Sequence, residues 1–499
     1  MARTHHLRTK DATGRIRPLL SVSCRRLITA LVCAVLSTGV TVRAGLASGT
    51  ISSPHITWSS CPKTAGYLCG ILQVPVVYGD SSRGSIPLSV IEHPVPQSRG
   101  IIVFNPGGPG ESGVLILPIL ASLMPEAVRN QFTFVSFDER GTGSSEPLAC
   151  GPSPAEAGSA ISGTLAAART FAGLDHACRS KYPHLFSTVD TTTSARDMDS
   201  LRLALGVNRI NFYGLSYGTV LGSVYRQMYP SHVRSMVLDG AVDANLSLPA
   251  DATLQAPALQ RALQNVLDGC ATTPGCTLGP DALNSYEQLL SRLSQHPLPP
   301  PGNGDDVPVT AGDLMTATLL YLSAPSFTPG YFPALQAAAF GDGAPLRSVA
   351  LGLETDLNGG SLVGALWAFT CNDASGHPSA TATVSLARRL EARFPLGGAE
   401  AVANNLIGCP GWTNRTGSIA HLVALRTQPP LVIGNTGDPN TPYAAAHLLA
   451  RSVGGRVTTY VGQGHSWLLN GSSSVCMQSV VSDYLVRGSL PAPRTRCVG

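Results

Sequence analysis

Apolar residues in the first half of the chain fall into short blocks that predict β-strands. Two blocks, 71–77 and 86–91, flank a turn at 79–84, which predicts an antiparallel pair. Helical stretches are predicted at 195–205 and 220–229. The remaining four strand-like blocks are compact and continuous, as is typical of strands buried on both faces, and they cover residues 100–104, 132–137, 210–213 and 233–238. Strands that alternate with helices predict a doubly wound, mostly parallel α/β sheet.

A different pattern begins near residue 243. Apolar residues there recur at helical spacing, as in Leu259, Ala262, Leu263, Val266 and Leu267. Helical stretches continue to about residue 405, with a proline-rich linker at 296–302. Strand-like runs return at 430–434 and 456–461. We therefore expect an α/β core in two parts, 45–242 and 411–499, interrupted by a helical cap at 243–410.

The first 44 residues have the layout of a secretory signal peptide. Arg25 and Arg26 precede an apolar run at 27–42, and small residues near Ala44 offer a cleavage site. The run is short for a membrane span and is interrupted by serine and glycine. We therefore expect an exported protein in the cell envelope or outside the cell, with an uncleaved membrane anchor as the alternative.

Removing this leader reverses the net charge. The whole chain has a net charge of +4, and residues 1–44 carry eight Lys or Arg against one Asp, a net of +7, which leaves −3 for the remainder. Nucleic-acid binding is therefore not expected. With 43% hydrophobic and 13% charged residues, the chain has the composition of a folded protein.

Cysteine usage agrees with an oxidising compartment. Ten cysteines follow the leader at wide, irregular spacing, which suits disulfides, and pairing of sequence neighbours gives 61–69, 150–178, 270–276, 371–409 and 476–497. Every one of Cys61, Cys69, Cys150, Cys178, Cys270, Cys276, Cys371, Cys409, Cys476 and Cys497 is then paired. The chain has neither C-x-x-C spacing among them nor an H-E-x-x-H motif, so we expect no metal site and no cofactor.

The strongest candidate for chemistry is the segment Gly214-Leu215-Ser216-Tyr217-Gly218. It lies between a predicted strand and a predicted helix, which is the nucleophile-elbow pattern. In a chain with 52 glycines, the G-x-S-x-G pattern alone is weak, so the claim depends on its context.

Candidate partners for Ser216 follow the later strands in the order that this pattern requires. Asp438 comes directly after the strand at 430–434, and His465 follows the strand at 456–461. Because a serine hydroxyl needs a neighbouring base to become a nucleophile, these positions predict a Ser216–His465–Asp438 triad.

A glycine-rich loop at 105–113 follows the strand at 100–104. Glycines allow the backbone to approach a reacting carbonyl closely. We expect the backbone N–H groups of Gly108 and Tyr217 to form an oxyanion hole.

These motifs together resemble a known family. The loop Asn105–Gly113 is similar to the glycine-proline signature of prolyl aminopeptidases, in the form found in secreted tripeptidyl aminopeptidases. Asp138–Ser145 resembles their D-x-R-G-x-G-x-S loop, and the elbow and the Asp438 and His465 segments match as well. The resemblance spans about residues 55–240 and 365–499. It implies an α/β-hydrolase fold and an exopeptidase that releases short peptides, above all tripeptides, from free N-termini.

An exopeptidase of this kind needs a carboxylate for the substrate's α-ammonium group. Asp373 is the first candidate, and Glu354 and Asp356 follow. Glu111 departs from the small residue usual in the family. Three roles are open for Glu111. Its negative charge interacts favourably with the dipole of the following helix, its side chain narrows the mouth of the site, or its carboxylate binds a substrate ammonium group. Arg140 is expected to hold its own loop together.

Two other functions remain open on the sequence. A secreted carboxylesterase would use the same triad without an ammonium anchor. A catalytically silent envelope binding protein would have the fold alone, although the intact Ser216, Asp438 and His465 argue against this.

Overall fold

The computed structural model describes residues 54–153, 155–157, 165–273, 275–302, 304–357, 362–414 and 419–499. The expected signal peptide at 1–44 lies outside these residues. The division of the remainder at residues 242 and 410 stays a prediction.

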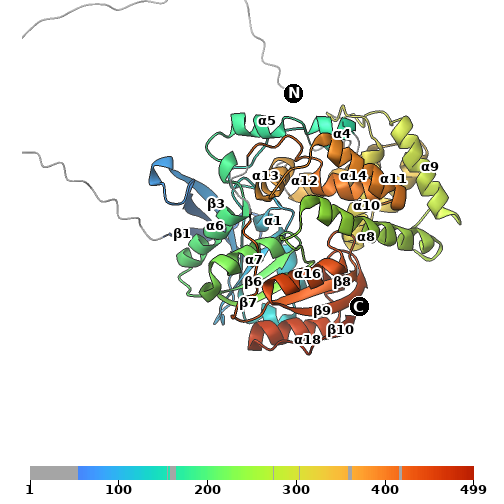
Figure 1. The fold of residues 1–499 in the computed structure, drawn as a ribbon. Coiled ribbons are helices and arrows are strands. Elements are labelled where there is room, and N and C mark those ends of the chain that lie inside the picture. Colours follow the sequence, from blue (N-terminus) through green and yellow to red (C-terminus); the bar gives the residue numbers. More distant parts are fainter. Residues whose placement is uncertain are drawn as a thin grey trace, which may run out of the picture. The chain divides into compact units, whose positions relative to one another are not determined.

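A ten-stranded sheet forms the centre of the described protein, in the order β1-β2-β3-β5-β4-β6-β7-β8-β9-β10 (Figure 1). Strands β1, β2 and β3 pair antiparallel, as do β3 and β5, and all pairs from β5 to β10 are parallel. The strands are β1 Ile56–Ser60, β2 Leu68–Pro75, β3 Ser85–His93, β4 Ile101–Asn105, β5 Thr133–Phe137, β6 Ile210–Leu215, β7 Val233–Asp239, β8 Leu431–Gly437, β9 Arg456–Gln463 and β10 Arg496–Val498.

The predicted mostly parallel α/β sheet is confirmed, and so is the antiparallel pair at its start. That pair is β2 and β3, in which Leu72 faces Leu88. The edge strands β1 and β10 were not predicted. The half-exposed β1 and the three-residue β10 carry too few apolar residues to form a clear pattern.

Alternating residues of the central strands pack on opposite faces of the sheet. In β4, Val103 belongs to one apolar cluster, whereas Ile102 and Phe104 belong to another. Phe212 and Tyr213 divide in the same way in β6. Because both faces are covered, these strands read as continuous apolar runs. The helices outside the insertion are α1 Gly113–Leu123, α2 Glu126–Arg129, α4 Leu165–Thr170, α5 Leu174–Lys181, α6 Thr191–Ala204, α7 Gly218–Met228, α16 Tyr443–Val453, α17 Trp467–Gly471 and α18 Val475–Ser482.

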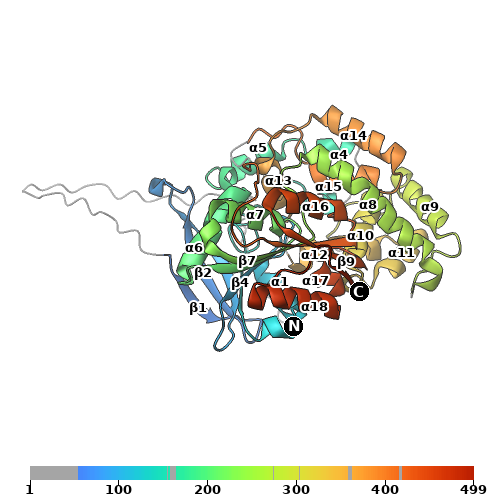
Figure 2. The ribbon, with the colours of Figure 1, turned by 60° about the horizontal axis from the view of Figure 1, so that its bottom comes forward.

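A helical insertion separates β7 from β8, as the pattern after residue 243 predicted. Its helices group together at one end of the sheet in both views (Figures 1 and 2). They are α8 Leu248–Asp268, α9 Ala282–Gln295, α10 Ala311–Ser323, α11 Tyr331–Ala339, α12 Ala344–Leu357, α13 Leu362–Asp373, α14 Ala380–Arg393 and α15 Gly398–Leu406. No helix in the described ranges is long and apolar enough to cross a membrane.

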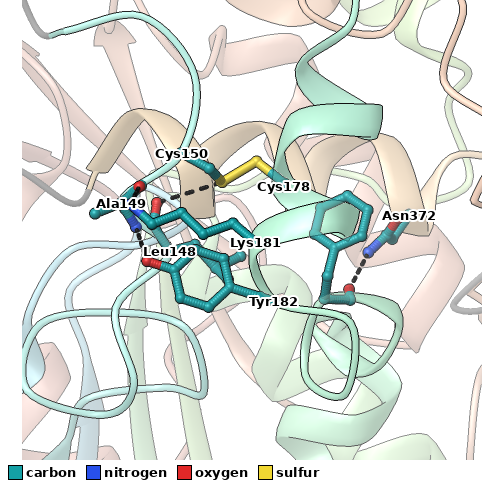
Figure 3. The surroundings of a disulfide bond; sticks show 8 residues. Leu148, Ala149, Cys150, Cys178, Lys181, Tyr182 and Asn372 are labelled. Carbon is teal, nitrogen blue, oxygen red and sulfur yellow. Dashed lines mark hydrogen bonds between the residues drawn. A yellow bond between two sulfur atoms is a disulfide. The ribbon is translucent and has the colours of Figure 1, made fainter. Parts of the chain in front are cut away.

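Five disulfides join the ten described cysteines, in the pairing of sequence neighbours. Figure 3 shows the Cys150–Cys178 bond, which ties α5 to the segment after the 138–145 loop. In the same view, Tyr182 Oη accepts a hydrogen bond from Ala149 N at 3.1 Å. Asn372 Nδ2 donates to the Phe186 carbonyl at 3.3 Å.

Arg140 holds its own loop in place, as expected. Its side chain is fully buried and binds Asp197 on α6 through two hydrogen bonds of 2.7 Å. The guanidinium also donates to the Val76 and Pro75 carbonyls at the end of β2. One ion pair therefore joins β2, the 138–145 loop and α6.

Breaking this buried pair is expected to destabilise the protein strongly. In Asp197→Asn, the charge of Arg140 stays buried without its partner, which costs about 3–5 kcal/mol. The free energy of unfolding, measured with urea, reports the change. Asp483→Asn is the matched control, because its pair with Arg487 has side chains 44% and 74% exposed, and such a pair is worth ~0–1 kcal/mol. Equal losses in the two variants would contradict the prediction.

Candidate active site

Ser216 occupies a sharp turn between β6 and α7. Its φ of 54° lies in the left-handed region, which L residues rarely adopt and which often marks functional sites. The flanking glycines permit this turn. A Cβ on Gly214 would collide with the Gly218 carbonyl, and one on Gly218 would lie 2.7 Å from the Asn105 carbonyl. The turn leaves Ser216 partly exposed among buried neighbours.

His465 and Asp438 form a buried pair. The Nδ1 atom of His465 lies 3.0 Å from each carboxylate oxygen of Asp438. The carboxylate also accepts the N–H groups of Asn440, Thr441 and Ser466 at 2.8–3.2 Å. These donors orient the carboxylate toward the imidazole, so that Nδ1 carries the proton in the neutral ring.

The imidazole lies beside the nucleophile elbow. Ser216 N donates to the Asp239 carbonyl at 3.0 Å, and a Cβ on the next residue, Gly240, would come within 2.9 Å of His465 Cε1. The Nε2 atom of His465 is buried and has no hydrogen-bond partner among the described residues. The Ser216 elbow and the His465–Asp438 pair therefore lie next to each other at the carboxyl edge of the sheet.

Carboxylates control the charge of His465. Burial opposes its charged form, but Asp438, Asp239 and Glu111 outweigh that effect and raise the pKa of the imidazole above its ordinary value of 6.5. The site therefore stabilises the imidazolium that forms when the histidine takes a proton.

The loop at 105–113 packs directly on the elbow. A Cβ on Gly107 would lie 2.7 Å from the Leu215 carbonyl and 2.9 Å from Ser216 Cβ. Asn105, the first residue of the loop, fixes it through its side chain. Its Oδ1 accepts a hydrogen bond from Gly107 N, and its Nδ2 donates one to Glu139. Gly108 and Tyr217 both line the cavity in front of Ser216.

This cavity has a volume of about 330 Å³ and lies between the sheet and the helical insertion. Three carboxylate side chains line it, those of Asp243, Asp251 and Asp373, and its lining among the described residues contains no Lys, Arg or His. Burial, and then Asp243, raise the pKa of Asp251 to about 6. A cavity with this lining attracts a positively charged group.

Asp373 lies at the end of α13 and is held by the core. Its carboxylate accepts Thr191 N at 3.0 Å and Thr191 Oγ1 at 2.6 Å. The neighbouring Asn372 donates to the Val189 carbonyl at 2.8 Å. Thr191 Oγ1 also lies 2.6 Å from the Tyr217 hydroxyl, so one chain of hydrogen bonds links Asp373 to the residue after Ser216. Burial, and then Asp190, raise the pKa of Asp373 well above its usual range.

Glu111 lies near His465 and is absent from the lining of the cavity. Burial raises its pKa to about 7, opposed by the nearby imidazole. The side chains of Glu354 and Asp356 lie outside the described part of the structure.

Several residues of this site were not predicted from the sequence. Asp239 and Asp243 follow the strand at 233–238, and an acidic residue at the carboxyl end of a parallel strand was a readable signal. Asp251 had no such signal in the sequence, because only the packing of α8 against the core places it in the cavity lining. The same holds for Ser323 at the end of α10, whose carbonyl accepts His465 N at 2.7 Å.

Comparison with known proteins agrees with this geometry. Residues 100–472 match the alpha/beta hydrolase fold family. The chain belongs to this family, and it is a serine hydrolase.

Three relatives show the range of enzymes that this chain is similar to. The chain is 30% identical to the serine protease Hip1 of Mycobacterium tuberculosis over 91% of its own length and 93% of that protein. It is also 30% identical to carboxylesterase B of the same species, over 90% and 91% of the two chains. A tripeptidyl aminopeptidase of Streptomyces coelicolor is 33% identical over 40% of each chain. The chain is therefore similar to both peptidases and an esterase.

Filling the space at Gly218 is expected to inactivate the site. In Gly218→Ala, the new methyl group meets the Asn105 carbonyl and Oδ1, both 2.7 Å from the Cβ position. The elbow and the 105–113 loop must then separate, at a cost of about 1–3 kcal/mol, and hydrolysis of a chromogenic ester should fall at least about tenfold.

Gly352→Ala is the matched control for this variant. The Cβ position there has open space within helix α12, and the change favours the helix by roughly 0.5–1 kcal/mol. Ester hydrolysis should stay as in the wild type. Full activity in Gly218→Ala would contradict the close packing of the two loops.

Proposed function

We propose that this protein is a serine exopeptidase that releases short peptides, tripeptides above all, from free N-termini. The observation that carries the proposal is the cavity beside Ser216, lined by three carboxylates and by no basic side chain among the described residues. A peptide N-terminus carries the positive charge that this lining attracts. The similarity to a serine protease and to a tripeptidyl aminopeptidase supports the same substrate class.

In the proposed reaction, Ser216 Oγ attacks the scissile carbonyl while His465 Nε2 takes its proton. Asp438 orients the ring and stabilises the imidazolium. The N–H groups of Gly108 and Tyr217 stabilise the oxyanion of the tetrahedral intermediate. His465 then protonates the leaving amine, and an acyl-enzyme forms on Ser216. Water, deprotonated by His465, hydrolyses this ester and releases the N-terminal fragment.

Asp373 is the proposed anchor for the α-ammonium group. Its carboxylate lines the cavity and is fixed by Thr191. Glu111 is the second candidate, and its closeness to His465 favours a role nearer the triad. An anchor at a fixed place in this cavity limits how many residues fit between it and Ser216, which would make the enzyme release fragments of defined length.

A carboxylesterase is the second candidate function, because the chain is 30% identical to carboxylesterase B, the same identity that it has to the serine protease Hip1. An esterase would use the same triad and would need no ammonium anchor. The carboxylates of the cavity favour the exopeptidase.

Matched peptides with free and acetylated N-termini test the proposed function. The free peptides should lose an N-terminal tripeptide, detected by mass spectrometry, and the acetylated peptides should be cleaved at least about tenfold more slowly because they lack the charge that binds the cavity. Ser216→Ala should abolish cleavage. Equal cleavage of both peptides would contradict the exopeptidase, and hydrolysis of simple esters with no peptide released would favour the esterase.

Loss of the anchor is expected to be selective. Asp373→Asn should lower kcat/KM for free peptides by about 10- to 100-fold, since a hydrogen bond to a charged group is worth about 1.5–3 kcal/mol. The slow cleavage of acetylated peptides should stay unchanged. Glu391→Gln is the control, because Glu391 is an exposed carboxylate on α14 of the same insertion, and the cleavage of both kinds of peptide should stay as in the wild type.

The pH dependence of this variant provides a second test. Because the pKa of Asp373 is raised, the carboxyl of the empty site takes up a proton as the pH falls and then binds an ammonium group weakly. In the wild type, KM for free peptides should therefore rise as the pH falls. This rise should be smaller in Asp373→Asn, where Asp251 remains to titrate in the same cavity, and a rise as large as in the wild type would exclude Asp373 as the anchor.

We also propose that the protein is exported by its N-terminal segment. The five disulfides support this, because such bonds persist in oxidising compartments. The layout of residues 1–44 supports it as well.

A further inference from the structure

Asp239 is a buried carboxylate that the proposed reaction does not use. It ends β7 and is fully inaccessible to solvent. One carboxylate oxygen accepts Trp467 N at 2.9 Å, and the other accepts Leu468 N at 3.0 Å and Tyr213 Oη at 2.9 Å. A carboxylate buried this deeply is costly unless several donors hold it, and here three donors do so.

The two backbone donors belong to the segment that carries His465. Helix α17 begins at Trp467, and Ser466 before it has a φ of 63° and no side-chain cap. The first N–H groups of a helix lack partners within the helix. The carboxylate of Asp239, at the end of β7, accepts two of these N–H groups. It thereby fixes the chain two residues after His465.

The main chain of Asp239 holds the other half of the site. Its carbonyl accepts Ser216 N at 3.0 Å. Within one residue, the carbonyl thus positions the nucleophile elbow and the carboxylate positions the histidine loop.

The charge of Asp239 also acts on the imidazole. Three carboxylates act electrostatically on His465: Asp438 acts through its charge and its hydrogen bonds, and Asp239 and Glu111 act through their charge. Burial raises the pKa of Asp239 to about 6, opposed first by the N–H groups of Trp467 and Leu468. These donors, together with Tyr213 Oη and the nearby imidazole, favour the ionised form of Asp239.

We propose that Asp239 is a positioning residue of the catalytic centre, which sets His465 against Ser216 and favours the imidazolium by its negative charge. The assignment of Ser216 and His465 to catalysis rests on the proposed function. Asp239 itself touches neither substrate nor the reacting atoms.

Asp239→Asn tests the proposal, because it keeps the size of the side chain and removes its charge. The new amide nitrogen must face a donor, so the histidine loop shifts. We expect kcat to fall about 10- to 100-fold with KM within about twofold of the wild type. The acid limb of the kcat/KM profile should move to lower pH, because the imidazolium loses a stabilising charge. A role in stability alone would leave this limb in place.

Two further variants complete the experiment. Asp239→Glu keeps the charge but lengthens the side chain, so kcat should fall while the acid limb stays at the wild-type pH. Asp199→Asn is the matched control, because this partly buried carboxylate pairs with Arg202 and His232 away from the cavity. It should lower the melting temperature and leave the pH profile unchanged.

Two substrates are used: a neutral chromogenic ester, and a peptide with a free N-terminus from which a tripeptide can be released. Failure of the proposed function would appear as ester cleavage without peptide release in the wild type, and the ester would still report the Asp239 variants. The proposal is overturned if the acid limb of Asp239→Asn stays in place or if kcat of both Asp239 variants stays within twofold of the wild type. It is also overturned if neither variant folds, since Asp239 would then serve stability alone.

Discussion

The parallel pairing of β6, β7, β8 and β9 is the constraint on which the site depends. Leu215 of β6 lies beside Asp239 of β7, and Asp239 lies beside Ile433 of β8. Because parallel strands end at a common edge, the segments that follow them emerge side by side. Residues more than two hundred positions apart in the chain therefore meet within hydrogen-bonding distance, as Asp239 and Trp467 do. Apolar clusters on both faces hold the strands in this register.

The helical insertion is part of the site as well as a cover over it. At the end of α10, Ser323 accepts hydrogen bonds from His465 N and, through its Oγ, from Asn440 Nδ2. On α8, Gln255 donates to the Asn440 carbonyl. The loops that carry Asp438 and His465 are thus fixed from both sides. A displacement of α10 would disturb the same loops that the sheet positions, which couples the shape of the cavity to the geometry of the reaction.

Buried and partly buried carboxylates gather around this cavity at a considerable cost in desolvation. The protein limits that cost by giving most of them donors, such as Thr191 for Asp373 and the N–H groups of α17 for Asp239. Asp251 is held less completely, and its carboxylate lies beside that of Asp243. A substrate ammonium group would relieve this crowding of negative charge. This is the charge complementarity that the proposed exopeptidase needs for a peptide N-terminus.

Local patterns in the sequence were sufficient for strands β2 to β9 of the sheet, the helical insertion and the order of Ser216, Asp438 and His465. Each of these depends on features that neighbours in the chain express, namely apolar periodicity and the residues that follow a strand. The short edge strands, the gathering of Asp243, Asp251 and Asp373, and the double role of Asp239 could not be read in this way. The carboxylates gather because α8 and α13 line the cavity beside Ser216. Asp239 has its double role because β7 lies between β6 and β8 in the sheet. Contacts between distant segments are decided by packing, and only the tertiary structure expresses them.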